Sequence, residues 1–218
     1  LCSRALGMER MDTQVGNIKV EVVEPLQSLR LLIDAPEHGM EADLLFTARA
    51  PAQEEPRFTR HLGSQLFMDY TRLTQNGQWE GWIKHQGERI NVAPVRWLGT
   101  RDRSWGIRPI GERDAQANPS SEPFQQFYWL WAPINWGDAV TRYHLNDDEF
   151  GDPWNTAGAF VPLQGEGDAE VMAQVSSHID FIPGTRHAKE IQIHRQRRRG
   201  AGEVTITMKP MFHLYMKG

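Results

Sequence analysis

Residues 101–109 concentrate side chains that could do chemistry in one short segment, RDRSWGIRP. Successive side chains of a β-strand point to opposite faces, so Arg101, Arg103 and Trp105 would share one face. Asp102 would lie on the other. Guanidinium groups are costly to bury unless they pair with carboxylates or stack on aromatic rings. Two interpretations follow: a structural Arg-Asp-Trp cluster that seals one end of a barrel, or a ligand site in which Arg103 and Trp105 point into a cavity.

The second notable segment is residues 124–131, which reads FQQFYWLW. The strand face with the largest rings comprises Phe127, Trp129 and Trp131. Tyr128 and Leu130 occupy the opposite face, so both faces are apolar and neither should meet water. Either both faces belong to the core, or one face lines a cavity. Large flat side chains around an enclosed space would suit an apolar ligand that contains rings or a polyene chain.

Other candidate sites are weaker. His178 and Asp180 are two residues apart on a predicted strand, where a carboxylate could orient an imidazole, although a surface pair is the commoner arrangement. A basic run at 194–199 could hold a phosphate or an acidic partner, although solvated charge at a hairpin tip is the simpler interpretation. The eight histidines are dispersed, without the spacing of a zinc site, and no nucleotide-binding or hydrolase motif is present. We expect no metal and no cofactor.

The composition limits the partners. Twenty-four Lys and Arg residues against 28 Asp and Glu give a formal charge of −4, which disfavours nucleic acid as a partner. The most apolar stretch, Phe127 to Ile134, is too short to span a membrane. Cys2 is the only cysteine, which fits a reducing compartment such as the cytoplasm but leaves the location open. The sequence starts at Leu1 rather than Met, so processing, trimming and a longer parent protein all remain open.

Alternation of apolar and polar residues predicts a mostly β protein. Short strands are indicated near residues 18–22, 29–33 and 44–50. Asn76-Gly77 predicts a tight turn between strands 66–74 and 78–84, since such pairs tolerate positive φ angles. His85-Gln86-Gly87 predicts a further reversal, and segments 190–196 and 203–208 predict another hairpin. We expect at most one or two short helices.

Two stretches are rich in polar residues, Gly and Pro and are predicted to be irregular: an exposed loop or linker at 111–123, and a second loop at 145–158. The first stretch divides the chain into two regions, each a β-barrel or a sheet, at 1–110 and 124–218. The sequence leaves open whether the second region is complete or truncated. The expected fold is therefore all-β, with one lipocalin-like (calycin) antiparallel barrel and part or all of a second barrel.

The pattern R-D-x-S-W-G-x-R at 101–108, with the predicted hairpin at 75–81 before it, resembles the double-calycin group that includes carotenoid 1,2-hydratases and related bacterial proteins. The resemblance covers roughly residues 40–160. It implies two packed lipocalin-like barrels with an apolar ligand in a cavity. The wider group also includes pericyclase-type enzymes that fold polyene substrates.

The hydratase site residues carry over only in part. Trp105 matches the tryptophan of the His and Trp pair that is two residues apart in those enzymes, but Arg103 stands where the histidine is expected. The expected Tyr and Asp are not matched, because residues 128–131 read YWLW and no carboxylate follows before Asp138. An arginine does not cycle a proton near neutral pH, so the catalytic group is unknown and Asp102 is the nearest alternative acid.

Two functions from different classes follow. In the first, the protein binds, and as an enzyme hydrates or cyclises, a hydrophobic unsaturated small molecule such as an isoprenoid, a steroid-like compound or a polyketide. The expected ligand contacts are Arg103, Trp105, Phe127, Trp129 and Trp131. In the second, it is a non-catalytic carrier of a hydrophobic ligand, and its Arg/Asp/Trp cluster is structural.

Overall fold

A computed structural model describes residues 4–5, 7–62, 64–107, 128–172, 174–196 and 203–214. These residues form fifteen strands in three antiparallel sheets and one turn of 3₁₀ helix, η1 (Pro36–His38). The expected all-β class is therefore confirmed. None of the helical structure in this part of the chain is long and apolar enough to cross a bilayer.

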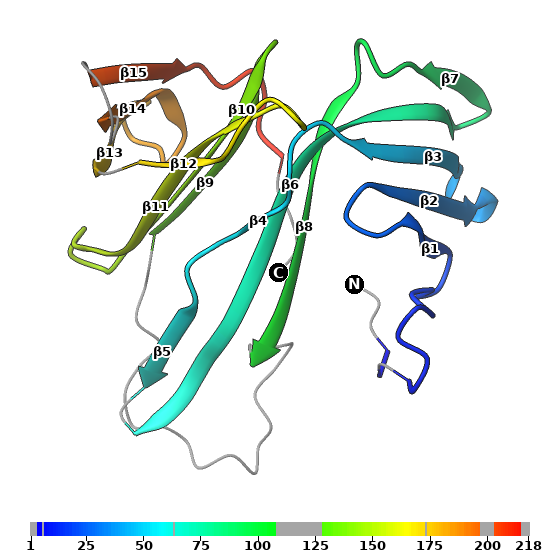
Figure 1. Ribbon diagram of the computed structural model, residues 1–218, viewed down its shortest axis with the longest axis horizontal. Coiled ribbons are helices and arrows are strands. Elements are labelled where there is room, and N and C mark those ends of the chain that lie inside the picture. The colour runs from blue at the N-terminus through cyan, green and yellow to red at the C-terminus, as the bar shows by residue number, and fades with distance from the viewer. Residues whose placement is uncertain are drawn as a thin grey trace.

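The largest sheet, here called sheet A, has eight strands and is organised around β6. Its strands are β1 (Ile18–Glu24), β2 (Ser28–Ala35), β3 (Met40–Ala48), β4 (Gln53–Glu54), β5 (Phe58–Leu62), β6 (Gln65–His85), β7 (Glu88–Val92) and β8 (Leu98–Ile107). Strands β3, β4, β5, β7 and β8 all pair with β6. Figure 1 shows β6 and β8 as two long neighbouring strands that run from the lower part of the molecule to its upper part.

The predicted turn at Asn76-Gly77 is wrong, because β6 continues through it as one strand of 21 residues. Asn76 is buried, and Gly77 pairs with Ala48 on one side and Gly99 on the other. A side chain on Gly77 would begin 2.2 Å from the ring of Phe46. The glycine is therefore needed for a close approach of an aromatic ring to the strand rather than for a reversal.

The next reversal is where the sequence predicts it. Gln86 and Gly87 have φ angles of 50° and 87°, and they join β6 to β7 through the pair His85–Glu88. Positive φ at both central residues is the geometry that matches the twist of a two-residue hairpin.

The second sheet, sheet B, has four strands in the order β12-β11-β10-β9. They are β9 (Tyr128–Asn135), β10 (Ala139–Asp147), β11 (Pro153–Pro162) and β12 (Glu170–Val171). The predicted irregular loop at 145–158 is therefore wrong: only residues 148–152 connect β10 to β11. The acidic run extends from Asp147, the last residue of β10, into this short turn, and the neighbouring polar residue Asn146 belongs to a strand with its side chain buried.

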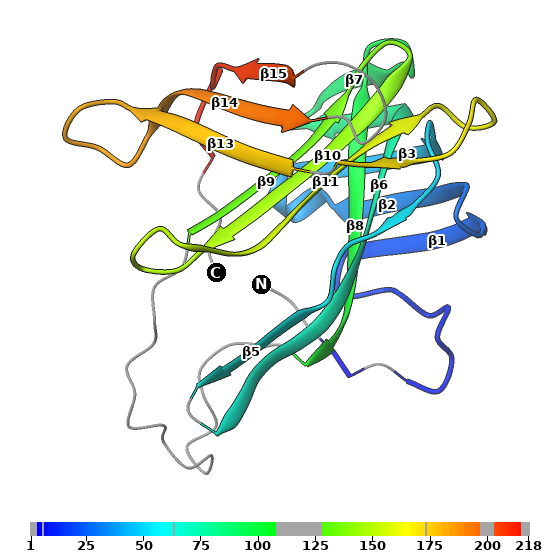
Figure 2. The ribbon, with the colours of Figure 1, turned by 60° about the vertical axis from the view of Figure 1, so that its left-hand side comes forward.

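Sheet C contains β13 (Gln174–Phe181), β14 (Ala188–Gln196) and β15 (Glu203–Met208). The predicted hairpin partners 190–196 and 203–208 do pair, with Ile193 opposite Ile206. Figure 2 shows the strands of sheet C crossing over those of sheet B. An apolar cluster fills the space between them; its buried members are Ala132, Tyr143, Leu145, Ile193 and Ile206.

Sheet A thus comes from residues before 108, and sheets B and C from residues after 127. The predicted linker at 111–123 lies outside the described residues. Ala50, which follows β3, packs against Val140, Ala159 and Val161 of sheet B, so apolar contacts connect the two sheets. In the described part of the chain, strand pairing closes none of the sheets into a ring.

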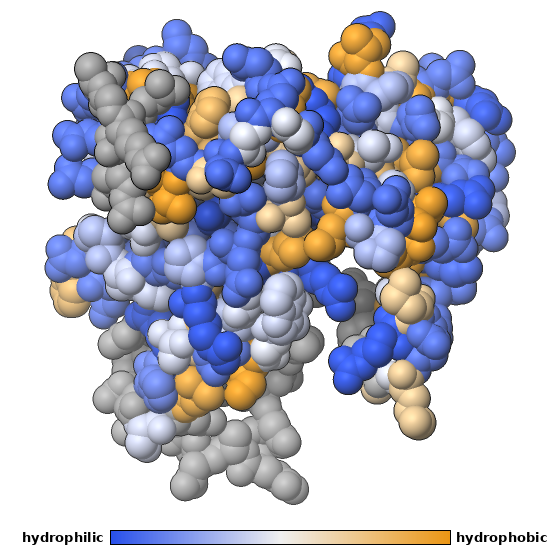
Figure 3. All heavy atoms as spheres, viewed as in Figure 1, coloured by the Kyte–Doolittle hydropathy of each residue, from blue (hydrophilic) through white to orange (hydrophobic). Residues whose placement is uncertain are grey.

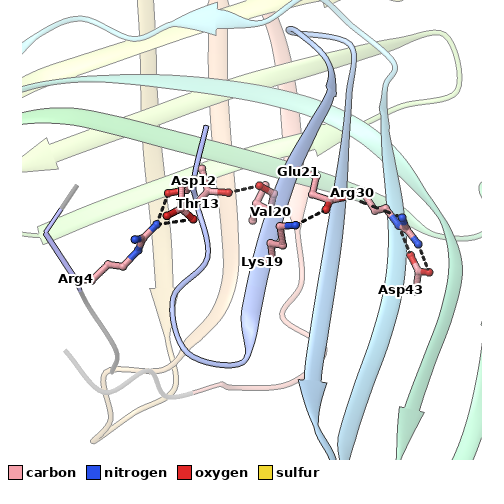
Figure 4. Close-up of polar contacts among 8 residues, drawn as sticks. All are labelled: Arg4, Asp12, Thr13, Lys19, Val20, Glu21, Arg30 and Asp43. Carbon is pink, nitrogen blue, oxygen red and sulfur yellow. Dashed lines mark hydrogen bonds and ion pairs between the residues drawn. The ribbon is translucent and has the colours of Figure 1, made fainter. Parts of the chain in front are cut away.

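Ion pairs cross the exposed face of sheet A, as Figure 4 shows. Arg30 of β2 donates two hydrogen bonds to Asp43 of β3, at 2.8 and 2.7 Å, and lies 3.9 Å from Glu21 of β1. Lys19 lies 2.6 Å from Glu21. Before β1, Arg4 pairs with Asp12 at 2.9 Å, and the hydroxyl of Thr13 donates to the carbonyl of Val20. Such exposed pairs contribute little to stability, about 0–1 kcal/mol each, but they mark this face as the solvent side.

Candidate functional site

Sheets A and B enclose ionisable side chains where a sandwich normally has an apolar core. The members of this buried charged centre are Glu55, Arg72, Thr74, Arg142, His144 and Asn146. The side chains of Glu55 and His144 are completely buried and that of Arg72 is 4% exposed. Burying charge is expensive unless partners compensate it, so such a cluster indicates either a specific structural network or a functional site.

Strand alternation places these residues. Arg72 and Thr74 are two apart on β6, and their shared face looks towards sheet B. Arg142, His144 and Asn146 occupy alternate positions of β10 and look back towards sheet A. Glu55 lies just after β4, where its backbone N–H donates to the carbonyl of Arg72 at 2.8 Å. This backbone bond fixes the carboxylate between the sheets.

Four polar groups converge on the Glu55 carboxylate. Its Oε1 accepts hydrogen bonds from Thr74 Oγ1 at 2.6 Å and from Trp131 Nε1 at 3.1 Å. Its Oε2 lies 3.5 Å from His144 Nδ1 and 3.8 Å from a terminal nitrogen of Arg72. Glu55 is therefore a point at which polar contacts join sheet A to sheet B.

His144 is the ionisable group of this centre that can change charge near neutral pH. Burial lowers the pKa of its imidazole; the Glu55 carboxylate and a hydrogen bond with Asn155 oppose this effect, while the charges of Arg142 and Arg72 add to it. The contact to Asn155 joins His144 Nε2 and Asn155 Oδ1 at 3.2 Å. The pKa of the imidazole therefore lies below its ordinary value of 6.5, which favours the neutral form at pH 7.

Aromatic rings surround the guanidinium of Arg72. Its central carbon lies 4.7 Å from the ring centre of Trp129, and 5.7–5.9 Å from those of Phe58, Tyr70 and Trp131. At the outer edge, Asp102 Oδ2 lies 3.2 Å from Arg72 Nε. Cation–π contacts and one half-exposed carboxylate thus compensate part of the charge.

The rings themselves touch one another, and together we call them the aromatic band: Phe58, Tyr70, Trp129, Trp131 and Trp154. Phe58 stacks on Tyr70 with ring centres 4.9 Å apart and meets the edge of Trp154 at 5.9 Å. Trp129 stacks on Trp131 at 6.2 Å. Arg72 lies between the two groups of rings, so the band is continuous from β9 to β11.

A β-bulge in sheet B determines where the side chain of Trp154 points. Asn146 pairs with Asn155 but Asp147 pairs with Pro153, so Trp154 is the additional residue of a β-bulge. Its ring reaches Phe58 and also lies 5.1 Å from the guanidinium of Arg60. A pocket of about 360 Å³ opens here, lined by Thr59, Arg60, His61, Asp148, Glu149, Phe150 and Trp154. One end of the aromatic band therefore forms part of a pocket wall.

The expected site residues fall in different places. Trp129 and Trp131 lie in the aromatic band, and Asp102 lies at its rim. Arg103 and Trp105 pair with Leu73 and Thr71 on the opposite face of sheet A. Trp105 is 49% exposed there, and Arg103 is also exposed. Phe127 lies outside the described residues. The structure thus separates Asp102 from Trp105 by strand face, as alternation predicts.

The remaining candidates are found on the surface or are only partly described. His178 Nε2 lies 3.1 Å from Asp180 Oδ1, but these side chains are 66% and 59% exposed, so they form a surface pair. In the basic run, His194 contacts the hydroxyl of Thr205 at 3.1 Å, and residues 197–199 lie outside the described part. Nowhere among the described residues do three or more His, Cys, Asp or Glu side chains come together as a metal site.

Sequence reasoning missed Glu55, Arg72, Arg142 and His144. The signal that could have indicated the last two is the alternation of Arg142, His144 and Asn146 with apolar residues on one strand. Glu55 and Arg72 have no comparable local signal, because their partners come from distant strands.

The fold and the centre together define an antiparallel all-β protein with ionisable groups sealed between two sheets. The chain belongs to a family described as "Family of unknown function (DUF8625)", whose model matches residues 1–218. No curated protein and no solved structure matches the chain significantly.

Proposed function

We propose that the protein binds a hydrophobic, unsaturated small molecule along the aromatic band. The observation that carries this proposal is the arrangement around Trp129. Trp129 is 42% exposed, yet its ring is held by stacking on Trp131 and by the guanidinium of Arg72. A large ring that is accessible and already ordered offers contact area at little entropic cost on binding. Isoprenoid, steroid-like and polyketide ligands have flat or extended apolar surfaces that suit it.

The proposal includes a relationship to the double-calycin group. The motif at 101–106 supports it, as does the large antiparallel sheet A, which would supply one wall of a lipocalin-like barrel. An apolar cluster on one face of sheet A has the composition expected of a barrel interior; its buried members are Ala42, Leu44 and Val92. Figure 3 shows a mainly hydrophilic surface on the face it presents, with apolar patches that are small and separate. That face has no extended apolar surface to which hydrophobic molecules would bind without specificity, which favours binding at a specific site.

The binding test is a fluorescence titration of the purified chain with a panel of polyenes and sterols, together with native mass spectrometry after organic extraction. We expect saturable quenching in the panel, weakened at least about tenfold by Trp129→Ala. Trp82→Ala is the matched control, because Trp82 packs on Arg89 near the β6–β7 hairpin, away from the band. Absence of any saturable ligand, or equal loss in both variants, would contradict the proposal.

A second candidate function is catalysis, favoured by the buried pair of Glu55 and His144. A carboxylate and an imidazole 3.5 Å apart form an acid–base pair of the kind that hydration or cyclisation of an unsaturated substrate requires, and a substrate would have to enter between sheets A and B to reach it, since neither side chain is exposed. In this version Glu55 and His144 replace Asp102 as the acid and base. Mass spectrometry of the incubated ligand distinguishes the two functions: a carrier releases it unchanged, whereas an enzyme converts it and Glu55→Gln stops the conversion.

A further inference from the structure

We propose that the pocket beside Trp154 is the entrance to the buried pair of Glu55 and His144, and that the ring of Phe58 is the gate that closes this entrance. The inference rests on the proposed function in its catalytic version, because it supplies the route by which a substrate reaches the acid and the base. It follows from the position of the Phe58 ring, from the contacts that the ring makes, and from the way in which β5 is held.

The ring of Phe58 lies between the pocket and the buried charged centre. On one side it meets the edge of the Trp154 ring, which lines the pocket, with ring centres 5.9 Å apart. On another side its centre is 5.8 Å from that of the His144 imidazole. Phe58 is only 3% exposed. One buried aromatic ring is therefore adjacent both to the wall of the pocket and to the imidazole.

The strand that carries Phe58 continues into the pocket, where Thr59, Arg60 and His61 form part of the lining. Because alternate side chains of a strand share a face, Arg60 points to the same side of β5 as Phe58. Its guanidinium lies 5.1 Å from the ring centre of Trp154. A ligand that moves along this face of β5 passes Arg60 and then meets Phe58, with His144 behind it.

The contacts of Phe58 are of a kind that a flat ligand can take over. Its ring stacks on Tyr70 with centres 4.9 Å apart and planes 8° from parallel. The guanidinium of Arg72 lies 5.7 Å from its ring centre. Stacking and cation–π contacts depend on the face of a π-system rather than on one particular side chain. An unsaturated ligand that displaces the ring would therefore find the same partners in its place.

β5 is a short strand at an edge of sheet A. In the described part of the chain its five residues pair with one strand, β6, and Figure 2 shows it beside the lower part of that strand. Contacts with Asp69 hold it on either side of Phe58: Arg57 donates to the carboxylate at 2.6 and 2.7 Å, and Thr59 donates at 3.0 Å. Exposed contacts of this kind are weak, and segments held by few contacts open locally more easily than a core. The strand that carries the gate can therefore yield without unfolding the sandwich.

The test measures how fast diethyl pyrocarbonate, which acylates neutral imidazoles, modifies His144 in the full chain. Peptide mass spectrometry reports each histidine separately, and His178, whose side chain is 66% exposed, is the internal reference. Burial favours the neutral form of His144, so a slow reaction reports restricted access rather than protonation. In the wild-type chain we expect His144 to react at least about tenfold more slowly than His178.

Phe58→Ala removes the gate and should raise the rate at His144 by at least about tenfold. Benzene, which can fill an apolar cavity left by a ring, should lower the rate in this variant again. Phe46→Ala is the matched control, because Phe46 is 1% exposed and packs on Trp79 in another part of sheet A. It should leave the rate at His144 at the wild-type value.

Removal of a buried ring can prevent folding, and a second pair of variants leaves the ring in place. Asp69→Ala removes the acceptor that holds β5 on both sides of Phe58, so it should raise the rate at His144. Asp43→Ala, which breaks an exposed ion pair with Arg30 on other strands of sheet A, should not.

Three outcomes overturn the gate: a wild-type His144 that reacts as fast as His178, equal rates at His144 in the wild-type chain and in Phe58→Ala, or a rise in Trp129→Ala alone. The last would place the entrance at the other end of the aromatic band. The labelling uses no hydrophobic ligand, so its outcome is independent of the fluorescence titration. Failure of the gate leaves binding along the band intact, whereas failure of the titration overturns the proposed function and leaves the labelling rates as they are.

Discussion

The carboxylate of Glu55 and the imidazole of His144 face each other across two sheets, with 3.5 Å between Oε2 and Nδ1 and neither side chain exposed to solvent. His144 belongs to β10 of sheet B, whereas Glu55 directly follows β4 of sheet A. Polar contacts become stronger as the surroundings exclude water, and the free-energy cost of breaking them rises as well. The stability of the protein should therefore depend strongly on a few polar side chains.

Removing the carboxylate tests this dependence. Glu55→Ala leaves Arg72 without its buried partner and removes the acceptor for Thr74 and Trp131. We expect the free energy of unfolding to fall by about 3–5 kcal/mol in urea denaturation. Asp43→Ala, which breaks the exposed pair with Arg30, should cost about 0–1 kcal/mol. Similar small losses in both variants would show that the centre contributes no more than a surface pair.

The pH dependence of stability follows from His144. Its folded-state pKa lies below the unfolded value near 6.5, mainly because of burial, so the unfolded chain binds a proton first as the pH falls. Stability from this group is complete above pH 6.5 and is lost below it, by at most about 1.4 kcal/mol per pH unit. Urea midpoints at pH 7.5 and 5.5 should thus differ more for the wild-type chain than for His144→Gln. The same pH dependence in both proteins would refute this assignment.

The hydrogen bond from Trp131 to the Glu55 carboxylate should contribute more to the free energy of unfolding than a hydrogen bond to a neutral acceptor. Trp131→Phe removes the N–H donor and should cost about 1.5–3 kcal/mol. The matched control is Trp136→Phe, which removes a donor to the hydroxyl of Thr141 at 2.6 Å and should cost about 0.5–1.5 kcal/mol. Thermal unfolding of the two variants measures the difference. A larger loss at Trp136 would be incompatible with a charged acceptor at Glu55.

Gly77→Ala tests the continuous strand. The added methyl group would lie 2.2 Å from the ring of Phe46 and 2.5 Å from the carbonyl oxygen of Thr47, so we expect a loss of about 1–3 kcal/mol or more. Gly137→Ala has no atom within 4 Å of its added carbon and should change stability by less than about 0.5 kcal/mol. A neutral Gly77→Ala would instead favour an exposed turn at this position.

Alternation in the sequence predicted the all-β class and the strands near residues 18–33, and the turn residues His85-Gln86-Gly87 predicted the reversal after β6. The turn predicted from the Asn76-Gly77 pair is wrong, because a glycine required by the Phe46 ring has the same appearance in the sequence as a glycine required by a turn. The loop predicted from the composition of residues 145–158 is also wrong, because strand residues that face a polar interior have the composition of a loop. In each case, tertiary partners outweighed local preference.

The candidate site shows the same limit. The aromatic density of residues 128–131 correctly drew attention to Trp129 and Trp131, and alternation placed Asp102 and Trp105 on opposite faces. Glu55 and Arg72 were not predicted, because isolated charged residues on strands usually face solvent. Only the packing of sheet A on sheet B turns them inwards.

The length of β6 has a consequence for how this sequence can vary. Its first half carries Arg72 and Thr74 towards sheet B, and its second half carries Trp79 and Ile83 into the apolar cluster of sheet A. Because side chains alternate along one unbroken strand, inserting or deleting a single residue near Gly77 would turn one half inside out relative to the other. Natural relatives should therefore conserve the number of residues between Arg72 and Trp79, even where the residues themselves differ.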